Sequence, residues 1–540
     1  MSKDIWNLSI ADTAALIEKG ELSPVTVVEA CLQRVELVGA SLDAFITLTA
    51  DVALEQARQA EAEIAAGKYR GPMHGIPFGL KDIYNTAGIL TSAHSRILID
   101  NLPDKDATTT AKLYEAGAVL LGKLATHEFA HGGPSFDLPW PLARNPWSPD
   151  HATGGSSSGS GAAVAAGLVK GAMGSDTGGS IRNPSCLCGI VGIKPTYGLV
   201  SRAGVIANSY TFDHCGPMTW TVEDCAIMLQ ALAGHDPADP ASADVEIPDY
   251  RAALTGDIRG LRIGVIRHFW EEEQNASDAV RDAMDSALDV LRGLGATTED
   301  ARMRPMQNYY DVKVTIAESE LFAIHADQLR VRPQDFGADF RGRVLPACLM
   351  SGADYVSAQR ERRTMLAEMA PLYEKYDLLV TAGVAPAGRL GTHQTVSFYQ
   401  KPSIATPFNV TGGPALAQCI GFTEDGLPLS MQIIGRPFDE TTVFRAAHAY
   451  EAATPWRDKR PDVPTSADPL VETPPPPPSL DESYRDKVSA AVTQAGLTLS
   501  DGDFAQVLAA APHVYDMVGR LRRDRDYGEE PGNTFSFGKR

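Results

Sequence analysis

Residues 154–182, GGSSSGSGAAVAAGLVKGAMGSDTGGSIR, carry the clearest structural signal in this chain. Two glycine-rich loops with hydroxyl side chains, 154–159 and 174–182, flank the small residues 162–168, which predict a tightly packed helix. Glycine has no Cβ, so consecutive backbone N–H groups can converge on one bound oxygen atom. A flexible Gly-Ser linker would not lie between apolar segments. The stretch therefore predicts an oxyanion-binding niche beside a serine nucleophile.

A serine nucleophile needs a base, and the candidate is Lys81, at the end of the apolar run in GIPFGLKD, residues 75–82. Apolar neighbours would desolvate the ammonium group and lower its pKa, which makes the neutral amine available. A lone lysine at a strand end is more often a surface or ion-pair residue. The prediction therefore depends on the combination of Lys81 with both serine-rich loops.

Short apolar runs alternate with helical patterns from residue 1 to about residue 460. Short buried strands between helices predict an α/β layered sheet, and we expect residues 1–460 to form one catalytic domain. The runs that predict strands are 76–80, 118–121, 261–266, 378–381 and 429–434.

The composition changes after this domain. Residues 461–482 are rich in proline and acidic residues, which predicts a stiff, extended linker. Residues 483–540 form a separate helical extension, and two helices bury little apolar surface alone. We therefore expect the extension to pack on the main domain or on a neighbouring chain. The helical patterns span 483–494 and 501–523, and an extended segment spans 528–540.

The chain has 540 residues, with 48 Lys and Arg against 68 Asp and Glu, which gives a net charge of −20. The acidic excess argues against nucleic acid as a partner, because such a surface needs clustered basic side chains. No apolar run reaches the roughly 18 residues of a membrane helix, and the N-terminus is too polar for a signal peptide. Seven scattered cysteines argue against a disulfide framework. We expect a cytoplasmic protein that binds no membrane.

Residues 127–131, HEFAH, match the HExxH pattern of zinc proteases. That chemistry needs both histidines on one helix, but Gly132, Gly133 and Pro134 follow at once. A third ligand at suitable spacing is also missing. We therefore expect a strand-to-loop junction here and no metal site.

Two other motif matches are weaker. Residues 117–123 resemble a P-loop, but Leu124 stands where a Ser or Thr hydroxyl must reach Mg²⁺. Residues 155–159 fit the GxSxG nucleophile elbow, so a serine hydrolase with His214 or His448 as base stays open. The residues before that motif form a poor strand, which favours the lysine-based alternative.

Taken together, these motifs resemble the amidase signature family of Ser–cis-Ser–Lys hydrolases. The resemblance extends over about residues 5–455 and implies a mixed, twisted central sheet with helices on both faces, plus a small helical C-terminal appendage. It also implies cleavage of a C–N amide-type bond without a metal or an organic cofactor. The matching segments are 75–82, 126–130, 154–159, 174–182, 192–198 and, more weakly, 426–435.

The resemblance also implies roles for individual residues. Ser180 is the expected acylated nucleophile, Ser156 the relay serine that follows a cis peptide bond, and Lys81 the base. The backbone N–H group of Ser180 is expected to join an oxyanion hole. The other implied oxyanion donors are Thr177, Gly178 and Gly179, and the implied supporting residues are Ser157, Asp176 and Arg182.

The family includes glutamine-using amidotransferase subunits, fatty-amide hydrolases and aryl acylamidases. Glutamine-using members resemble one another by an acid near the position of Ser403, and its absence here argues against a glutaminase. His131 is a candidate substrate-binding residue in the aromatic-rich loop 131–147. We therefore expect a small apolar or aryl amide or carbamate as substrate. The aromatic residues of this loop are Phe136, Trp140 and Trp147.

The extension is loosely similar to the small C subunit that wraps amidotransferases and some carboxybiuret-type amidases. Fused through the proline-rich linker, it would clamp its own amidase domain or that of a partner in a homodimer. Two hypotheses stay open: a stand-alone amidase, and an amidase-like subunit of an amidotransferase or other complex, glutamine-using or non-catalytic. The presence of Lys81, Ser156 and Ser180 favours catalysis.

Overall fold

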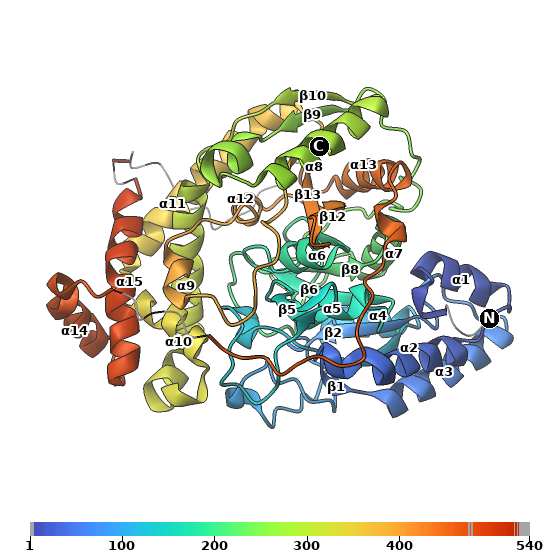
Figure 1. Ribbon diagram of the computed structural model, residues 1–540, viewed down its shortest axis with the longest axis horizontal. Helices are drawn as coiled ribbons and strands as arrows, with labels where there is room; N and C mark the ends of the chain where they lie inside the picture. The colour runs from blue at the N-terminus through green and yellow to red at the C-terminus, as the bar shows by residue number, and fades with distance from the viewer. Residues whose placement is uncertain (1–4, 474–475, 477–478, 523, 526–527, 529–540) are drawn as a thin grey trace.

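The computed structural model describes the chain except for residues 1–4, 474–475, 477–478, 523, 526–527 and 529–540 (Figure 1). Its core is a sheet of eleven strands surrounded by helices. In spatial order the strands are β1 (Phe45–Leu48), β3 (Val119–Leu124), β2 (Pro77–Lys81), β6 (Gly171–Asp176), β8 (His214–Thr219), β7 (Val191–Lys194), β12 (Ala415–Phe422), β13 (Pro428–Gly435), β11 (Leu378–Ala382), β9 (Arg262–Val265) and β10 (Thr297–Asp300).

The sheet is mixed. Strands β3, β2 and β6 run parallel, as do β11, β9 and β10, whereas the strands between β6 and β11 pair antiparallel. Successive side chains of a strand point to opposite faces. In β6, Ala172 packs in the cluster of helix α5 (Ser158–Ala165), and Met173 packs in the cluster of helix α7 (Val222–Leu232). Helices therefore cover both faces, which confirms the predicted fold class.

Helix α5 follows the first serine-rich loop and begins earlier than the sequence pattern predicts, at Ser158 rather than near residue 162. Its serines and glycines fit where larger residues would not. A Cβ on Gly159 would lie 2.4 Å from the backbone nitrogen of Ala125. The helix stops before Gly167, whose φ of +72° suits glycine. Small residues thus let α5 pack directly against the sheet.

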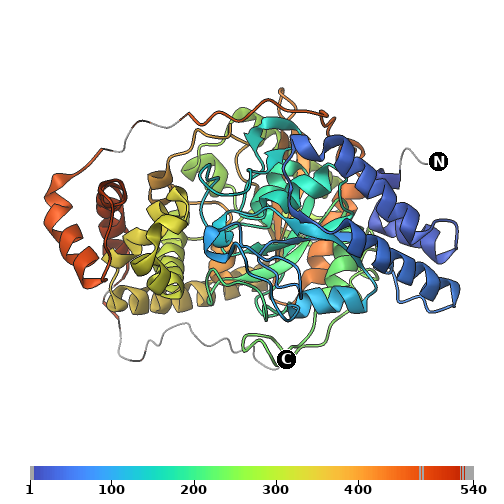
Figure 2. The same ribbon diagram turned by 90° about the horizontal axis from the view of Figure 1, so that it is seen from below.

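The C-terminal extension forms helices α14 (Arg485–Gln494) and α15 (Asp501–Arg520) at one end of the molecule (Figures 1 and 2). Helix α15 lies beside helices α9 (Met306–Val331) and α10 (Ala338–Val344) of the same chain, and α14 packs on α15. The predicted helices are therefore present. The expected extended segment, apart from Gly528, lies outside the described residues.

Apolar burial and two ion pairs hold α15 in place. Leu508 and Val514 are fully buried. The charged pairs are Arg341 with Asp503, whose Nε and Oδ1 are 2.8 Å apart, and Arg520 with Asp311, whose Nε and Oδ2 are 2.7 Å apart. The extension therefore packs on the preceding part of its own chain. The described part of the linker crosses the surface of that part (Figure 2), where the Arg144 side chain donates to the carbonyl of Asp468.

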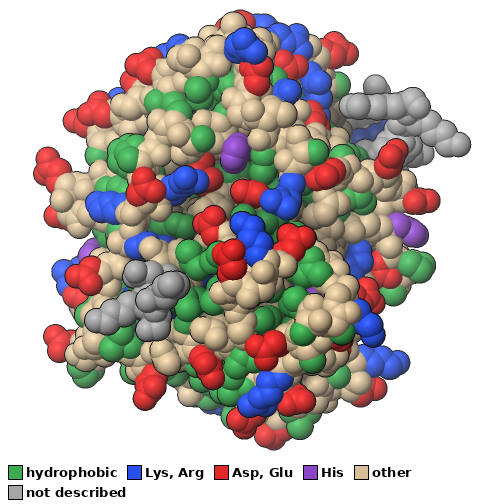
Figure 3. Space-filling view, turned by 90° about the vertical axis from the view of Figure 1, so that its right-hand side faces the viewer, with side chains coloured by type: hydrophobic (Ala, Val, Ile, Leu, Met, Phe, Trp, Pro, Cys, Tyr) green, Lys and Arg blue, Asp and Glu red, His purple; other side chains and the backbone are tan. Residues whose placement is uncertain are grey.

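The surface carries interspersed charges on the face drawn in Figure 3, where acidic and basic side chains alternate. Although the net charge of the chain is −20, the acidic side chains on that face are not gathered in one patch. Among the helices that the structure describes, none is long and apolar enough to cross a bilayer.

Candidate active site

Lys81 ends strand β2 and is fully buried. Its Nζ lies 2.7 Å from Ser156 Oγ and 2.8 Å from Ser175 Oγ. Burial lowers the pKa of Lys81 to about 7, against the opposing effect of the nearby carboxylates of Asp213 and Asp176. A substantial fraction of this lysine is therefore an uncharged amine near neutral pH, in contact with two hydroxyl groups.

Ser156 lies in the first glycine-rich loop, just before α5, and a cis peptide bond joins it to Gly155. Its carbonyl oxygen accepts a hydrogen bond from the backbone N–H of His127, at 3.0 Å. A Cβ on Gly155 would lie only 2.0 Å from Cε1 of the His127 ring. Glycine at position 155 therefore allows the close approach that holds Ser156 against Lys81.

Ser180 lies in the loop between β6 and helix α6 (Arg182–Cys188) and is partly exposed, whereas Ser156 is buried. The backbone N–H of Ser157 donates to the carbonyl of Ser180, at 3.3 Å. This contact joins the two serine-rich loops, and it brings the backbone of Ser180 next to the residue that follows Ser156. Of Lys81, Ser156 and Ser180, only Ser180 is partly exposed, as a residue that attacks a substrate must be.

Ser157 and Ser175 connect the loops a second time. The Ser157 hydroxyl donates to the carbonyl of Ser175 and accepts from its backbone N–H, both at 3.3 Å. These bonds hold Ser157 between the loops, where the resemblance predicts a supporting residue. Ser175, which sequence reasoning did not single out, is the second hydroxyl on Lys81. The sequence signal for Ser175 is its position within the motif GSDTGGS, residues 174–180.

The expected oxyanion donors differ in availability. The backbone N–H of Gly179 donates to Asp176 Oδ1, at 2.7 Å. Because its N–H group is bonded to this carboxylate, Gly179 is not available as an oxyanion donor in this structure. The amides of Gly178 and Ser180 have no acceptor within the described part of the chain. Thr177 is held by its hydroxyl, which donates to Asp213 Oδ1 at 2.5 Å. The loop therefore offers at least two free N–H groups beside the Ser180 hydroxyl.

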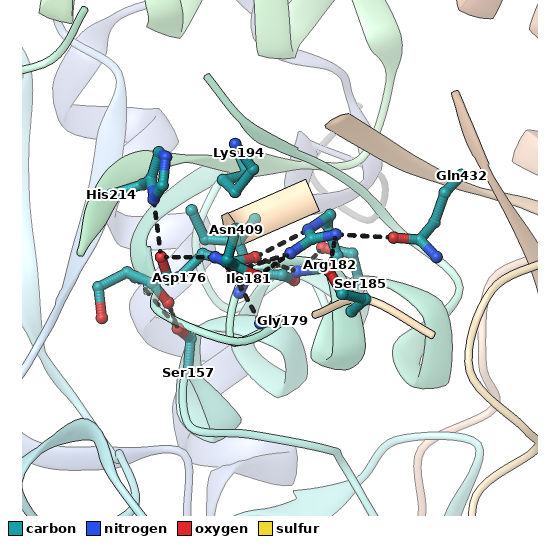
Figure 4. A network of polar contacts seen from close by, with 12 residues as sticks. Ser157, Asp176, Gly179, Ile181, Arg182, Ser185, Lys194, His214, Asn409 and Gln432 are labelled. Atoms are coloured by element: carbon teal, nitrogen blue, oxygen red, sulfur yellow. Dashed lines mark hydrogen bonds and ion pairs between the residues drawn. The ribbon is translucent and has the colours of Figure 1, made fainter. Parts of the chain in front are cut away.

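Asp176 and Arg182 form a fully buried ion pair under this loop (Figure 4). Arg182 Nε lies 3.0 Å from Asp176 Oδ2. Two residues far away in sequence complete the network: Asn409 accepts from Arg182 at 2.6 Å and donates to Asp176 at 2.7 Å, and Gln432 accepts from Arg182 at 2.9 Å. Burial alone would raise the pKa of Asp176, but Arg182 holds it well below its ordinary value. The pair stays charged and braces the loop.

The two histidines of HEFAH have separate partners. His127 Nδ1 lies 2.7 Å from the carbonyl oxygen of Gly132, and burial lowers the His127 pKa to about 3. His131 Nε2 lies 3.1 Å from Glu318 Oε2. A short 3-10 turn, Glu128–Ala130, joins them in place of a helix. The segment is the predicted junction, and within the described residues no group of three His, Cys, Asp or Glu side chains could hold a metal.

The expected aromatic pocket does not form around Trp147. Its indole N–H donates to the carbonyl of Cys188, at 2.8 Å, and its ring packs on Phe422 with 4.8 Å between centroids. Trp147 therefore contributes to packing. His131 is buried beside Glu318 and faces the ring of Phe398. The ring of Phe340 also packs on it, so the imidazole lies among one carboxylate and two aromatic rings and is engaged with all three.

A cavity of about 190 Å³ reaches Ser175 and Asp213. It shares Arg202 and Tyr210 with a larger cleft of about 1560 Å³. That cleft is lined on one side by α14 of the extension, including Lys487. The extension thus borders a space that adjoins the surroundings of Lys81.

Comparison with known proteins agrees with this geometry. The sequence model of the amidase family, described as Amidase, matches residues 26–444. A relative in Chloroflexus aurantiacus, the A subunit of glutamyl-tRNA(Gln) amidotransferase, is 39% identical over 485 residues, which are 85% of this chain and 99% of the relative. The family match ends before the linker and the extension.

Solved structures give the same result. The peptide amidase from Stenotrophomonas maltophilia has a TM-score of 0.74 and 30% identity, over 84% of this chain and 98% of that chain. A structure described as a vestigial protein complex that reveals the evolutionary origins of an s-triazine catabolic enzyme has a TM-score of 0.77 and 32% identity, over 82% and 98%. The chain belongs to the amidase signature family. Its activity is hydrolysis of an amide C–N bond.

Proposed function

We propose that this chain hydrolyses a small amide through an acyl-enzyme on Ser180, with Ser156 as proton relay and Lys81 as base. The observation that carries the proposal is the 2.7 Å contact between Lys81 and Ser156, made by a lysine whose pKa is about 7. A lysine that is partly uncharged and held on a hydroxyl has the geometry and the proton affinity of a general base.

The steps follow from this geometry. Neutral Lys81 accepts the hydroxyl proton of Ser156, which accepts the proton of Ser180, and Ser180 Oγ bonds to the amide carbon. The negative oxygen binds the N–H groups of Gly178 and Ser180. The relay returns a proton to the amide nitrogen, the C–N bond breaks, and the amine or ammonia leaves. Water then attacks the ester by the same route, which releases the acid and restores Ser180.

For the substrate, we propose a small polar amide. The apolar or aryl preference loses its main support, because Trp147 is engaged in packing and the buried His131 is paired with the carboxylate of Glu318. Relatives named as components of an amidotransferase instead favour the alternative, in which the chain is the amide-hydrolysing member of a larger assembly. Aryl amides and carbamates are thus the less supported classes.

For the extension, we propose a clamp that acts in cis, in the place of a separate small subunit. Its support is the buried face of α15 and the two ion pairs to α9 and α10. The clamp needs no second copy of the chain, so the homodimer expected from the sequence is not required for it. A partner protein that receives the released ammonia stays within the proposal.

An assay of amine and ammonia release with the purified full-length chain tests the function. The substrates are glutamine, short peptide amides, aliphatic amides, anilides and a carbamate. We expect turnover of at least one polar amide that falls by at least about 1,000-fold in Ser180→Ala. Equal turnover in Ser180→Ala would contradict the mechanism. Preferred turnover of anilides would contradict the substrate class.

A further inference from the structure

We infer that Lys313 binds an anionic group of the substrate, a carboxylate close to the scissile amide, and so determines specificity. This inference rests on the proposed function, because it assigns the part of the substrate that lies beside the nucleophile loop. Lys313 belongs to α9, far in sequence from the serine-rich loops, and it takes no part in the proton relay proposed above.

The position of Lys313 brings its charge to the reaction site. A Cβ placed on Gly178 would lie 3.2 Å from Lys313 Cε and 3.7 Å from Lys313 Nζ. Gly178 is partly exposed and carries one of the free N–H groups expected to bind the carbonyl oxygen. An amide carbonyl at that N–H group therefore places the adjoining part of the substrate within reach of the Lys313 ammonium.

The ammonium of Lys313 lacks a close acceptor. Lys313 is 6% exposed, and the nearest acid oxygen among the described residues is Glu318 Oε1 at 3.7 Å, beyond hydrogen-bond distance. Glu318 lies closer to His131, at 3.1 Å. Nζ makes no hydrogen bond within the described part of the chain, although an ammonium has three N–H donors. Its ion pair with Glu318 is therefore a loose one, and a further acceptor at Nζ would stabilise the buried charge.

The neighbouring cation Arg343, in contrast, has a carboxylate within hydrogen-bond distance. Its Nε lies 2.9 Å from Asp339 Oδ2, in a paired arrangement of ordinary distance. Both cations face the ring of Phe398, with Lys313 Nζ 5.6 Å and the Arg343 guanidinium carbon 5.0 Å from its centroid. Lys313 is thus the less satisfied of the two cations in this cluster.

Charge considerations agree with an anionic ligand. Burial lowers the pKa of Lys313, while Glu318 and Asp213 raise it. A carboxylate bound at Nζ would add a further opposite charge and favour the ammonium form. The ligand class is therefore an amide that carries a carboxylate within a few bonds of the carbonyl carbon.

The test uses matched substrate pairs in which a carboxylate replaces a methyl group: malonamate with propionamide, succinamate with butyramide, and glutaramate with valeramide. Ammonia release is measured with the full-length chain and with Lys313→Met. We expect the wild type to prefer the carboxylate member of at least one pair. We expect Lys313→Met to raise KM for that member about 10- to 100-fold, the effect of losing a charged hydrogen bond.

The neutral amides separate a failed inference from a failed mechanism. Their kcat/KM should stay within about threefold in Lys313→Met, because the variant keeps the relay. Lys313→Arg retains the charge and should recover part of the preference even if the Met variant folds poorly. No carboxylate preference in the wild type, or equal losses for both members of a pair, would overturn the role of Lys313. Absence of turnover for all amides would instead contradict the proposed function.

Discussion

The side-chain nitrogen of Lys81 lies 2.7 Å from the hydroxyl oxygen of Ser156, and both groups are buried. Water is largely excluded from this contact, so the protonation of Lys81 depends on its protein neighbours. The desolvated environment favours the neutral amine, whereas Asp213 and Asp176 favour the ammonium. The balance between these effects determines the pH range in which the relay operates.

The pH dependence of hydrolysis should report Lys81. Its pKa is lowered to about 7, so the lysine is protonated and inactive as a base below that pH and neutral above it. We expect kcat/KM to rise tenfold per pH unit below about 7 and to level off above it. Lys81→Ala should lose most activity over the whole range.

Lys170 provides the matched control for this profile. It is also buried with a lowered pKa, but it donates to the carbonyls of Ile5 and Leu8, away from the serine loops. Lys170→Met should leave the midpoint of the profile unchanged. If the kcat/KM of the wild type did not rise with pH up to about 7, this would contradict the role of Lys81 as the base.

Gly155→Ala should inactivate the enzyme without changing a reacting group. The added Cβ would meet the His127 ring at 2.0 Å, so Ser156 must move away from Lys81. A displacement of about 1 Å at a reacting group lowers rates about 100-fold. Gly293→Ala is the control, because nothing lies within 4 Å of its added Cβ. Retained activity in Gly155→Ala would show that the loop tolerates the shift.

Arg182→Met should destabilise the fold. It leaves the fully buried carboxylate of Asp176 without its charged partner, which costs about 3–5 kcal/mol. Denaturant unfolding followed by fluorescence measures the loss. Arg259→Met, which breaks an exposed ion pair with Asp257, should cause no detectable change. Equal stability of the two variants would mean that the buried Arg182–Asp176 pair does not stabilise the fold.

Leu508→Ala should loosen the C-terminal extension. Leu508 is fully buried in α15, and removal of such a side chain costs about 2–5 kcal/mol. We expect faster proteolytic cleavage between the linker and α14 than in the wild type. Val471→Ala, at a position that is 77% exposed, should be cleaved at the wild-type rate. Identical cleavage of both variants would contradict the packing of α15 on the amidase domain.

The site was predictable from sequence where its residues are close together. Residues 154–182 contain both serine-rich loops, whose glycines and serines predicted an oxyanion-binding niche, and in the structure the two loops are in contact. Apolar runs also located strands: the run 261–266 contains β9, and the run 378–381 falls within β11. Local patterns predict local structure because short-range geometry determines them.

Contacts between distant segments were not predictable. Asn409 and Gln432 reach Arg182 from other elements, and Lys313 and Glu318 lie in the middle of a long helix without a motif. Trp147 shows the same difficulty, since an aromatic residue in a loop can pack inward or line a pocket. The strand order decides these contacts, and no local pattern gives that order.

Covalent labelling with a fluorophosphonate probe, followed by peptide mass spectrometry, tests the central claim most directly. The full-length wild type should carry one adduct, on Ser180. Ser180→Ala should carry none, and Lys81→Ala should be labelled much more slowly, because the relay no longer activates the hydroxyl. A folded wild type that stays unlabelled, or an adduct on another residue that persists in Ser180→Ala, would contradict the account.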